Sequence, residues 1–239
     1  AMPQPVDTDE AVSFHHVTFR CPGAEVPTLS DIDFTAKRGQ TIGIIGGTGS
    51  GKSSLVNMIP RFYDATAGEV LIGGRDVKSF EIPELRERIG IVPQKAVLFK
   101  GSIRDNMRWG KDDATDDEIL AAAKTAQAAD VIESKGGLDF EIEQGGKNLS
   151  GGQRQRFTIA RALVRKPEIL ILDDSASALD FATDAALRRS IREMDTNPTV
   201  FIVSQRTSSI QHADKIIVID DGKIAGIGKH DELLNNCPV

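Results

Sequence analysis

The glycine-rich segment from Gly46 to Ser53 contains the residue types that bind phosphate groups. Its sequence, Gly-Gly-Thr-Gly-Ser-Gly-Lys-Ser, matches the pattern G-x-x-x-x-G-K-[ST]. Glycines let backbone N–H groups converge on an anion, because no bulky Cβ atom obstructs the approach. Lys52 would neutralise the terminal phosphates of ATP, and the Ser53 hydroxyl would bind Mg²⁺. We therefore expect this phosphate loop to bind Mg-ATP through Gly46, Thr48, Gly49, Ser50, Gly51, Lys52, Ser53 and the following Ser54.

Two carboxylates follow the apolar segment Ile169–Leu172. Asp173 is expected to orient Mg²⁺ through water. Asp174 occupies the position of a general base, which would activate the attacking water. Its side chain is one methylene shorter than that of glutamate, and a displacement of about 1 Å can cost on the order of a hundredfold in rate. We expect slow hydrolysis at this site, and the alternative is that Asp174 acts through a relayed water.

Strand and helix patterns alternate along most of the chain. Short apolar segments of strand length occur at Thr41–Ile45, Ile89–Val92, Ile169–Leu172, Thr199–Val203 and Lys215–Ile219. Segments with helical spacing occur at Lys52–Phe62, Gln153–Val164 and Ala182–Met194. This alternation predicts an α/β fold with a parallel sheet covered by helices on both faces. The phosphate loop would follow one such strand, and Asp173 would end another.

Two regions depart from this alternation. Val12–Thr35 alternates apolar and polar residues, and Gly68–Ile72 is followed by a glycine turn and a short strand, which is typical of antiparallel strands. Residues from about 94 to 166 are mostly helical and read as an insert. There, Thr115 and Glu118 predict a capping box for a helix over Asp116–Ala129. The acidic residues within 112–117 lack the spacing of a calcium loop, and we interpret them as carboxylates that offset the helix dipole.

Charge and composition narrow the class of protein. The chain has 239 residues, a formal net charge of −6 and 40% hydrophobic residues. A negative charge argues against a nucleic-acid platform, which normally has a basic face. No apolar run approaches the roughly 18 residues needed to cross a bilayer, and no signal peptide is visible. Ala1 before Met2 is typical of a cloning remnant, so we expect a piece of a longer protein. Cys21 and Cys237 are interpreted as free thiols.

The segment Leu149-Ser150-Gly151-Gly152-Gln153 precedes a predicted helix and offers a hydroxyl and free N–H groups to an anion. Together with the phosphate loop and Asp173, it resembles the nucleotide-binding domain of an ATP-binding cassette (ABC) transporter, and the resemblance covers Val12 to Leu234. It implies a P-loop NTPase (RecA-like) core with a parallel sheet, an antiparallel β subdomain and an inserted α-helical subdomain. It also implies that this signature segment caps the γ-phosphate of ATP bound to a partner, in a head-to-tail dimer.

The same resemblance assigns further positions. Gln94 resembles the glutamine that senses Mg²⁺ and couples to transmembrane helices, and Ser177–Asp180 resembles the loop that crosses between the two sites. Glu143–Gly146 falls where exporters contact intracellular loops, and Gly101–Asn106 is also typical of exporters. We therefore expect an exporter subunit at the cytoplasmic face of a membrane, with transmembrane domains contacting the Gln94 region and Glu143–Gly146. The implied domain is 1–239, with the ATP-binding core at 10–93 and 167–239 and the helical signature subdomain at 94–166.

Three positions differ from the pattern of this family. Asp174 replaces glutamate, Gln205 replaces the histidine after the next strand, and Cys21 stands where an aromatic residue would stack on adenine. Gln205 can bond a γ-phosphate through its amide but cannot carry charge. Cys21 has no π-face, so adenine contact is expected to be weaker or taken over by Phe19 or Phe14. Alternatively, the aromatic position lies one or two residues away.

The combination of an altered site with an intact signature resembles the degenerate half of a heterodimeric exporter. In that interpretation a different partner supplies the catalytic Glu and His, and this chain supplies Ser150 to Gln153 to the partner's site. One alternative is a homodimeric exporter ATPase with Asp174 as a working base. A second alternative is a non-transport cassette that acts as a nucleotide-gated clamp in repair or translation. Such clamps usually carry tandem cassettes, coiled-coil inserts or basic arms, and no such feature is visible here.

Overall fold

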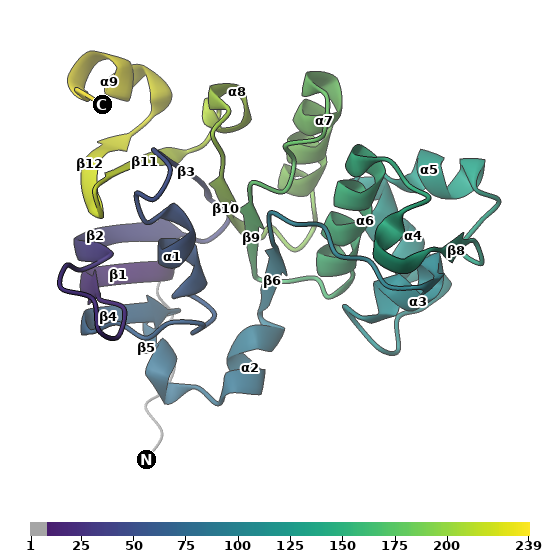
Figure 1. Ribbon diagram of the computed structural model, residues 1–239, viewed down its shortest axis with the longest axis horizontal. Coiled ribbons are helices and arrows are strands. Elements are labelled where there is room, and N and C mark those ends of the chain that lie inside the picture. Colours follow the sequence, from purple (N-terminus) through teal and green to yellow (C-terminus); the bar gives the residue numbers. More distant parts are fainter. Residues whose placement is uncertain (1–8) are drawn as a thin grey trace. The chain divides into compact units, whose positions relative to one another are not determined.

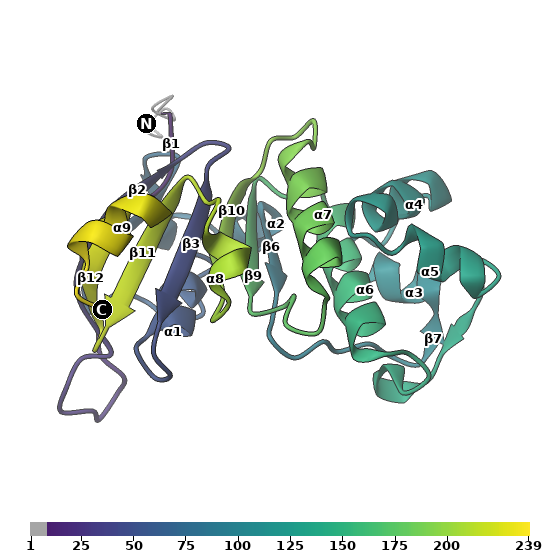
Figure 2. The ribbon, with the colours of Figure 1, turned by 90° about the horizontal axis from the view of Figure 1, so that it is seen from above.

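The structure, a computed structural model, describes residues 9–239, so Ala1 and Met2 lie outside the described residues. Strands and helices alternate, and the predicted α/β class is confirmed. The chain divides into two compact units. The first comprises residues up to 89 together with 199–239, and the second comprises residues 90–198. Figures 1 and 2 label their elements.

An antiparallel sheet in the first unit has the strand order β2-β1-β4-β5. Its strands are β1 (Glu10–Phe19), β2 (Leu29–Lys37), β4 (Ala67–Ile72) and β5 (Arg75–Asp76). The alternation in the sequence has its expected effect, because Phe14 is buried and stacks on Phe34 at 4.7 Å between ring centroids. The predicted antiparallel strands are confirmed.

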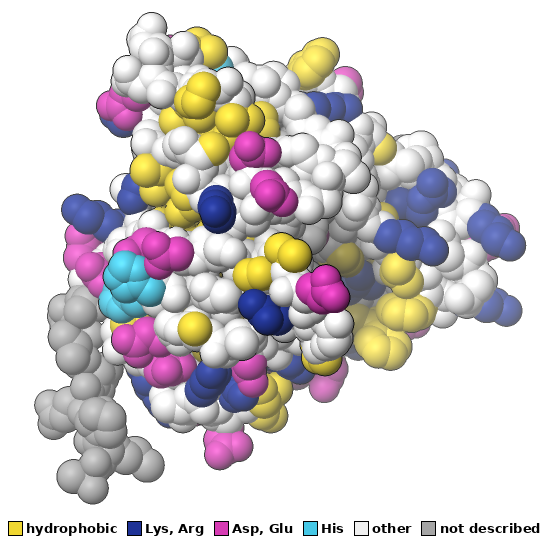
Figure 3. All heavy atoms as spheres, turned by 60° about the vertical axis from the view of Figure 1, so that its left-hand side comes forward, with side chains coloured by type: hydrophobic (Ala, Val, Ile, Leu, Met, Phe, Trp, Pro, Cys, Tyr) yellow, Lys and Arg dark blue, Asp and Glu magenta, His cyan; other side chains and the backbone are white. Residues whose placement is uncertain are grey.

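A bulge in β1 places His16 next to two carboxylates of β2. His16 has φ 48°, and the register with β2 shifts between Phe14 and Val17. Its imidazole lies 2.7 Å from an Asp31 oxygen and 3.4 Å from an Asp33 oxygen. Figure 3 shows histidine side chains next to acidic side chains on this exposed face. The hydrogen bond to Asp31, followed by the charges of Asp33 and Asp31, raises the pKa of His16.

Parallel strands form the other layer of the first unit. β3 (Thr41–Gly46) lies between β10 (Thr199–Val203) and β11 (Lys215–Asp220), and both neighbours run parallel to it. β12 (Lys223–Gly228) pairs antiparallel with β11 after a turn at Asp221 and Gly222, which have φ 47° and 73°. β3 has no room for a side chain at Gly43, because a Cβ there would lie 2.8 Å from the Cβ of Ile210 in α8 (Thr207–Ile210). Figure 2 shows α9 (His230–Asn236) lying over β11 and β12.

The helix that follows the phosphate loop is shorter than the sequence predicted. α1 extends over Lys52–Asn57 instead of reaching Phe62, and its C-cap is Met58. Pro60 explains the early end, because the residue before a proline is disfavoured in the helical region. Turns follow, and Arg61 has φ 57°. The remaining elements, which the sequence patterns did not predict, are the 3-10 helix η1 (Val77–Ser79) and α2 (Ile82–Glu87).

The second unit is mostly helical. β6 (Ile89–Val92), which begins at its border, and β9 (Ile169–Asp173) are neighbours in strand order. α6 (Gly151–Val164) packs against α3 (Ile103–Arg108) and α4 (Asp116–Thr125), as Figures 1 and 2 show. The other elements are α5 (Ala129–Ser134), α7 (Phe181–Arg192), the 3-10 helix η2 (Gln144–Gly146), and the paired strands β7 (Gly101–Ser102) and β8 (Glu141–Ile142).

Two local predictions in this unit need correction. The helix expected over Asp116–Ala129 ends at Thr125, because Gln127 takes a left-handed conformation with φ 62°. Thr115 accepts a hydrogen bond from the Glu118 backbone N–H at 3.2 Å, which is one half of the expected capping box. The Glu118 carboxylate pairs with the Lys111 ammonium, because a charged donor attracts it more strongly than a backbone N–H.

Across residues 9–239, no helix has both the length and the apolar character that crossing a bilayer requires.

Candidate nucleotide-binding site

The phosphate loop in the first unit directly follows β3, which ends at Gly46. Gly49 and Gly51 have φ 75° and 105°, a region in which side chains with a Cβ are strained. Gly51 is also confined by its neighbours, because a Cβ there would lie 2.8 Å from Leu29 Cδ2. The Lys52 ammonium folds back and donates hydrogen bonds to the carbonyl oxygens of Gly46 and Gly47. The carbonyl oxygens of the phosphate loop thus hold the Lys52 ammonium in place.

Several observations fit a bound triphosphate. The Ser50 hydroxyl is buried and has no hydrogen-bond partner among the described residues. A Cβ at Gly47 or Gly49 would meet nothing within 4 Å, so the outer side of the loop is open. Thr48 and Ser53 are exposed, and Ser54 is half-buried. An orphan hydroxyl, a lysine bonded to weak carbonyl acceptors and open glycines form a cradle for an anion. The hard oxygen of Ser53 suits Mg²⁺.

The segment that carries Cys21 is tied to the phosphate loop within the first unit. Cys21 is exposed, and its sulfur lies 3.6 Å from the Thr28 hydroxyl. The Thr28 carbonyl lies 3.1 Å from the position that a Cβ would take at Gly51. Cys21 is therefore next to the predicted nucleotide site. The expectation that Phe14 or Phe19 takes over the contact with adenine is wrong, because their exposed fractions are only 0% and 5%.

Gln205 follows β10 in the same unit, and its side chain is exposed. The turn around it is held by its neighbour, because the Ser204 hydroxyl accepts a hydrogen bond from the Arg206 backbone N–H at 3.0 Å. This anchored turn presents an amide to solvent where a titratable histidine was expected. The amide can donate or accept a hydrogen bond, but it does not change charge with pH.

The second unit brings Gln94 and Asp174 together. β9 ends at Asp173, which is half-buried, and Asp174 follows with φ 50°. Asp is one of the residues that tolerate this left-handed conformation. The Gln94 side-chain amide donates a hydrogen bond to Asp174 Oδ2 at 3.3 Å. The two residues predicted to act on Mg²⁺ and on water are thus direct neighbours.

The signature segment begins α6 in the second unit. Ser150 is the N-cap of α6, and it exchanges two hydrogen bonds with Gln153 in a complete capping box. Gly151 and Gly152 pass close to the 177–180 loop, since a Cβ at Gly152 would lie 3.2 Å from the Ala178 carbonyl oxygen. The helix-cap interpretation of Ser150 is therefore correct as local structure. It leaves the exposed face of the segment open to an anion.

Gln155, which the sequence analysis missed, joins the signature helix to the 177–180 loop. Its side chain is 6% exposed. Its amide donates to the Ser177 hydroxyl at 3.0 Å, and its carbonyl accepts from the Ala178 backbone N–H at 2.8 Å. Asp180 then caps α7 by accepting from the Thr183 N–H at 2.8 Å, and that bond lowers the pKa of Asp180. A polar residue on the buried side of a predicted helix was the signal available in the sequence.

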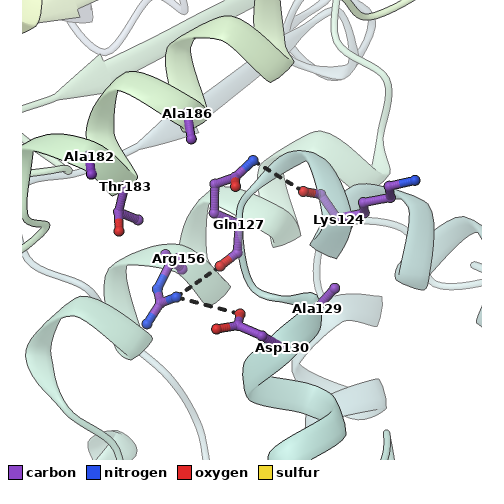
Figure 4. A pocket seen from close by; sticks show the side chains of 8 residues that line it. All are labelled: Lys124, Gln127, Ala129, Asp130, Arg156, Ala182, Thr183 and Ala186. Carbon is purple, nitrogen blue, oxygen red and sulfur yellow. Dashed lines mark hydrogen bonds and ion pairs between the residues drawn. The ribbon is translucent and has the colours of Figure 1, made fainter.

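A pocket of about 450 Å³ lies close to the signature helix in the second unit (Figure 4). Arg156 forms one wall, and its guanidinium donates to the Gln127 carbonyl at 2.9 Å and lies 3.6 Å from Asp130. The same guanidinium donates to the Gly152 carbonyl of the signature segment at 3.3 Å. Arg156 therefore braces the signature segment against the corner between α4 and α5.

An exposed aromatic surface on the second unit is formed by Phe99 and Trp109. Phe99 and Trp109 stack with ring centroids 4.6 Å apart, and Trp109 is 68% exposed. The Gly145 N–H donates to the Leu98 carbonyl at 3.1 Å. The two segments predicted to contact transmembrane domains, around Gln94 and at Glu143–Gly146, are thus joined. Phe99 and Trp109 could not be recognised from the sequence, because isolated aromatic residues carry no periodic pattern.

Comparisons with known proteins agree with these features. A profile of the ABC transporter family matches residues 29–177. An uncharacterized ABC transporter ATP-binding protein of Mycobacterium tuberculosis is 47% identical over 223 residues, which cover 92% of this chain and 38% of that protein. A Staphylococcus aureus protein, named as a candidate multidrug export ATP-binding/permease protein, is 41% identical over 233 residues, which cover 97% of this chain and 40% of that protein.

A solved structure of a bacterial Atm1-family ABC exporter with ATP bound has a TM-score of 0.91 and 36% identity, covering 99% of this chain and 42% of that chain. The chain spans less than half the length of these relatives. The profile match includes the phosphate loop, the signature segment and Asp173, which are the segments whose local geometry suits phosphate and metal binding. The chain belongs to the ABC transporter family.

Proposed function

We propose that the chain is the ATP-binding part of an ABC exporter that works at the cytoplasmic face of a membrane. The similar proteins named for export support this, and each of them is more than twice as long as the matched part. The additional length in the relatives leaves room for the transmembrane domains that would carry a substrate. In this proposal ATP binding and hydrolysis drive those domains between inward-facing and outward-facing states.

Four residues would hold Mg-ATP. Lys52 would exchange its carbonyl partners for the terminal phosphates, which are stronger acceptors because they are charged. Ser53, Gln94 and Asp173 offer the oxygen ligands that Mg²⁺ prefers, either directly or through water. When bound, Mg²⁺ neutralises charge that develops on the phosphate oxygens. The buried Ser50 hydroxyl supports the proposal independently, because it lacks a partner among the described residues.

The site of this chain would hydrolyse ATP slowly. The hydrogen bond between Gln94 and Asp174 carries this proposal, because it directs a short carboxylate toward a neighbouring side chain. A general base must come within about 2.6–3.2 Å of the proton that it removes, or act through one water. Gln205 adds an uncharged amide where a histidine was expected. Binding would therefore be retained while proton transfer is impaired.

The signature segment would act on ATP held by a partner. Ser150 to Gln153 lies at the start of a fourteen-residue helix, where N–H groups and the helix dipole favour an anion. Gln155 and Arg156 hold this segment in place through the bonds described above. We infer a heterodimer, in which a different chain supplies the catalytic Glu and His while this chain completes the partner's site.

Transmembrane domains would dock on the surface formed by Phe99 and Trp109 and on the bonded segment Glu143–Gly146. Large exposed aromatic residues are enriched at the centres of protein interfaces. In the full-length protein, Trp109→Ala is expected to weaken the coupling of hydrolysis to transport while the isolated domain keeps its affinity for ATP. Unchanged coupling in that variant would contradict this docking surface.

The decisive experiment measures ATP affinity and steady-state hydrolysis of this chain alone with Mg²⁺. The comparison is a double variant, Asp174→Glu with Gln205→His, and Lys52→Ala is the control that removes phosphate binding. The proposal predicts clear binding with negligible turnover, and activity gained by the double variant. Brisk turnover by the wild type that Asp174→Ala abolishes would instead favour a homodimeric exporter ATPase. Specific binding to DNA or ribosomes would favour the clamp.

A further inference from the structure

The pocket of Figure 4 has no part in the proposed chemistry of ATP, and the eight residues that line it all belong to the second unit. Its walls come from three places in the chain, which are the corner between α4 and α5, Arg156 of α6, and the first turns of α7. Its volume of about 450 Å³ lies within the range of small-molecule sites, roughly 300–1,000 Å³. The side chains on these walls indicate which class of small molecule fits.

Arg156 brings an unused hydrogen-bond donor to this pocket. Its Nη1 donates to the Gln127 carbonyl at 2.9 Å, and its Nε donates to the Gly152 carbonyl at 3.3 Å. Within residues 9–239, its second terminal nitrogen, Nη2, has no hydrogen-bond partner. The side chain is only 17% exposed, so water screens its charge less than on an open surface. A ligand carboxylate is the acceptor that suits a guanidinium in this position.

Three acceptors line the same pocket. The Asp130 carboxylate lies 3.6 Å from Arg156 Nη1, beyond hydrogen-bond distance, and its side chain is 78% exposed. The side-chain oxygen of Gln127 has no partner in the described part of the chain, because the hydrogen bonds of that amide are made by its nitrogen. The Thr183 hydroxyl donates to Asp180 at 3.0 Å and keeps its lone pairs. An ammonium group, which has three donors and no acceptor, complements these acceptors.

The remaining wall of the pocket is apolar. Ala129, Ala182 and Ala186 line it with methyl groups. Lys124 contributes its aliphatic stem, and Figure 4 shows its ammonium extending away from Arg156. The charges that face the pocket are therefore one guanidinium and one carboxylate. A ligand that carries both charges matches this pair, whereas an ion of one sign is repelled by one of the two groups.

We propose that this pocket binds an aliphatic α-amino acid. The carboxylate of the ligand accepts from Arg156, its ammonium donates to the three acceptors, and its side chain packs on the alanines. Arg156 also links this site to the signature segment, because a charged carboxylate competes with the neutral Gly152 carbonyl for the same guanidinium. Binding at this site does not rest on the proposed function, since none of these groups belongs to the phosphate loop or to the expected Mg²⁺ ligands.

An NMR titration of the 239-residue chain with L-leucine, in the absence of nucleotide, tests the proposal. We expect a dissociation constant of about 0.1–10 mM, which is ordinary for a ligand of this size. Isocaproate lacks the ammonium of leucine, and isoamylamine lacks the carboxylate. Each should bind at least about tenfold more weakly than leucine, because each loses charged hydrogen bonds.

Variants of the chain locate the site. Asp130→Asn should weaken leucine binding by about tenfold, because the ammonium loses a charged acceptor. Asp112→Asn is the matched control, since it changes an exposed carboxylate of the same unit that does not line the pocket. Ala186→Leu should abolish binding by filling the pocket, and thermal melting shows whether it folds. Leucine should shift the amide signal of Gln153, whose peptide bond contains the Gly152 carbonyl, in the wild type but not in Ala186→Leu.

Three results would overturn the proposal. No saturable binding of leucine in the stated range excludes the site, and equal affinities for leucine and isocaproate exclude the ammonium contacts. Equal affinities of Asp130→Asn and Asp112→Asn place the ligand elsewhere. A Gln153 signal that stays unchanged at saturation contradicts the link to the signature segment. Failure of the proposed function leaves all of these measurements unchanged, because the titration contains no nucleotide.

Discussion

Replacing Gln155 by leucine tests whether one buried amide holds the signature helix to the 177–180 loop. Leucine has nearly the same volume, so the substitution removes polar contacts without opening a large cavity. Two hydrogen bonds are lost, one from the Gln155 amide to the Ser177 hydroxyl at 3.0 Å and one from the Ala178 N–H to the Gln155 carbonyl at 2.8 Å. Gln155, Ser177 and Ala178 all lie within the second unit.

The expected cost follows from these two bonds. A typical intramolecular hydrogen bond contributes about 0.5–1.5 kcal/mol, so the free energy of unfolding should fall by about 1–3 kcal/mol. Ser177 and Ala178 belong to an exposed loop, so water can reach their freed polar groups. The additional penalty for an unsatisfied buried group should therefore be small.

Urea unfolding can be followed through the single tryptophan, Trp109, which lies in the same unit and stacks on Phe99. Hydrogen exchange provides the local readout, and the Ala178 amide should exchange faster in Gln155→Leu. Ser177→Ala is the control, because it removes one of the two bonds and should cost less. A double-mutant cycle between the two positions should give a coupling energy near that of one hydrogen bond.

A stability within about 0.5 kcal/mol of the wild type, which is the usual range for surface substitutions, would refute this reasoning. Unchanged exchange at Ala178 would refute it independently. Either result would mean that contacts of Gly151 and Gly152 with the loop suffice to hold the two segments together.

Two further predictions concern the first unit. Asp31 and Asp33 raise the pKa of His16 above its ordinary value of 6.5, so their stabilisation is complete below that value and is lost as the pH rises through the folded-state pKa. His16→Gln should therefore narrow the difference between urea midpoints measured at about pH 5.5 and about pH 8.5, and an unchanged difference would contradict this assignment. At the phosphate loop, a Cβ on Gly46 would lie 2.2 Å from the Ile219 carbonyl oxygen, whereas a Cβ on Gly47 would meet nothing within 4 Å. Gly46→Ala should lower stability by about 1–3 kcal/mol and Gly47→Ala by much less, and equal thermal melting of the two variants would exclude the steric argument.

Local sequence patterns predicted the strands better than the helix ends. The apolar segments became β3, β6, β9, β10 and β11 with bounds that differ by at most one residue. A buried parallel strand needs only a short apolar run between turn residues, and such a run is visible without its neighbours. Helix α4 ended four residues early at a left-handed Gln127, whose amide donates to the Ser190 hydroxyl at 2.8 Å. That partner is 63 residues away in sequence, so no local pattern could reveal it.

The candidate site shows the same division. The residue types at Lys52, Ser53, Asp173 and Ser150 were enough to predict phosphate and metal chemistry, because that chemistry depends on side-chain groups and short spacings. The alternating pattern of β1 predicted a buried face that includes Phe14, but residue type alone could not show whether Phe14 or Phe19 contacts a ligand, since the same aromatic residue can pack in a core or lie open to a ligand.

Chemical identity and short-range geometry are therefore encoded locally in this protein. The glycine loop, the strand that ends in Asp173 and the cap at Ser150 each depend on fewer than ten consecutive residues, and their energetics are set by backbone conformation and nearby hydrogen bonds. Tertiary packing decided the pairing of Gln94 with Asp174, the hydrogen bonds of Gln155 to the 177–180 loop, and the position of Thr28, which Cys21 contacts, beside Gly51. Each of these joins segments distant in sequence, and such contacts form only when burial of the core compensates the entropy of closing the chain between them.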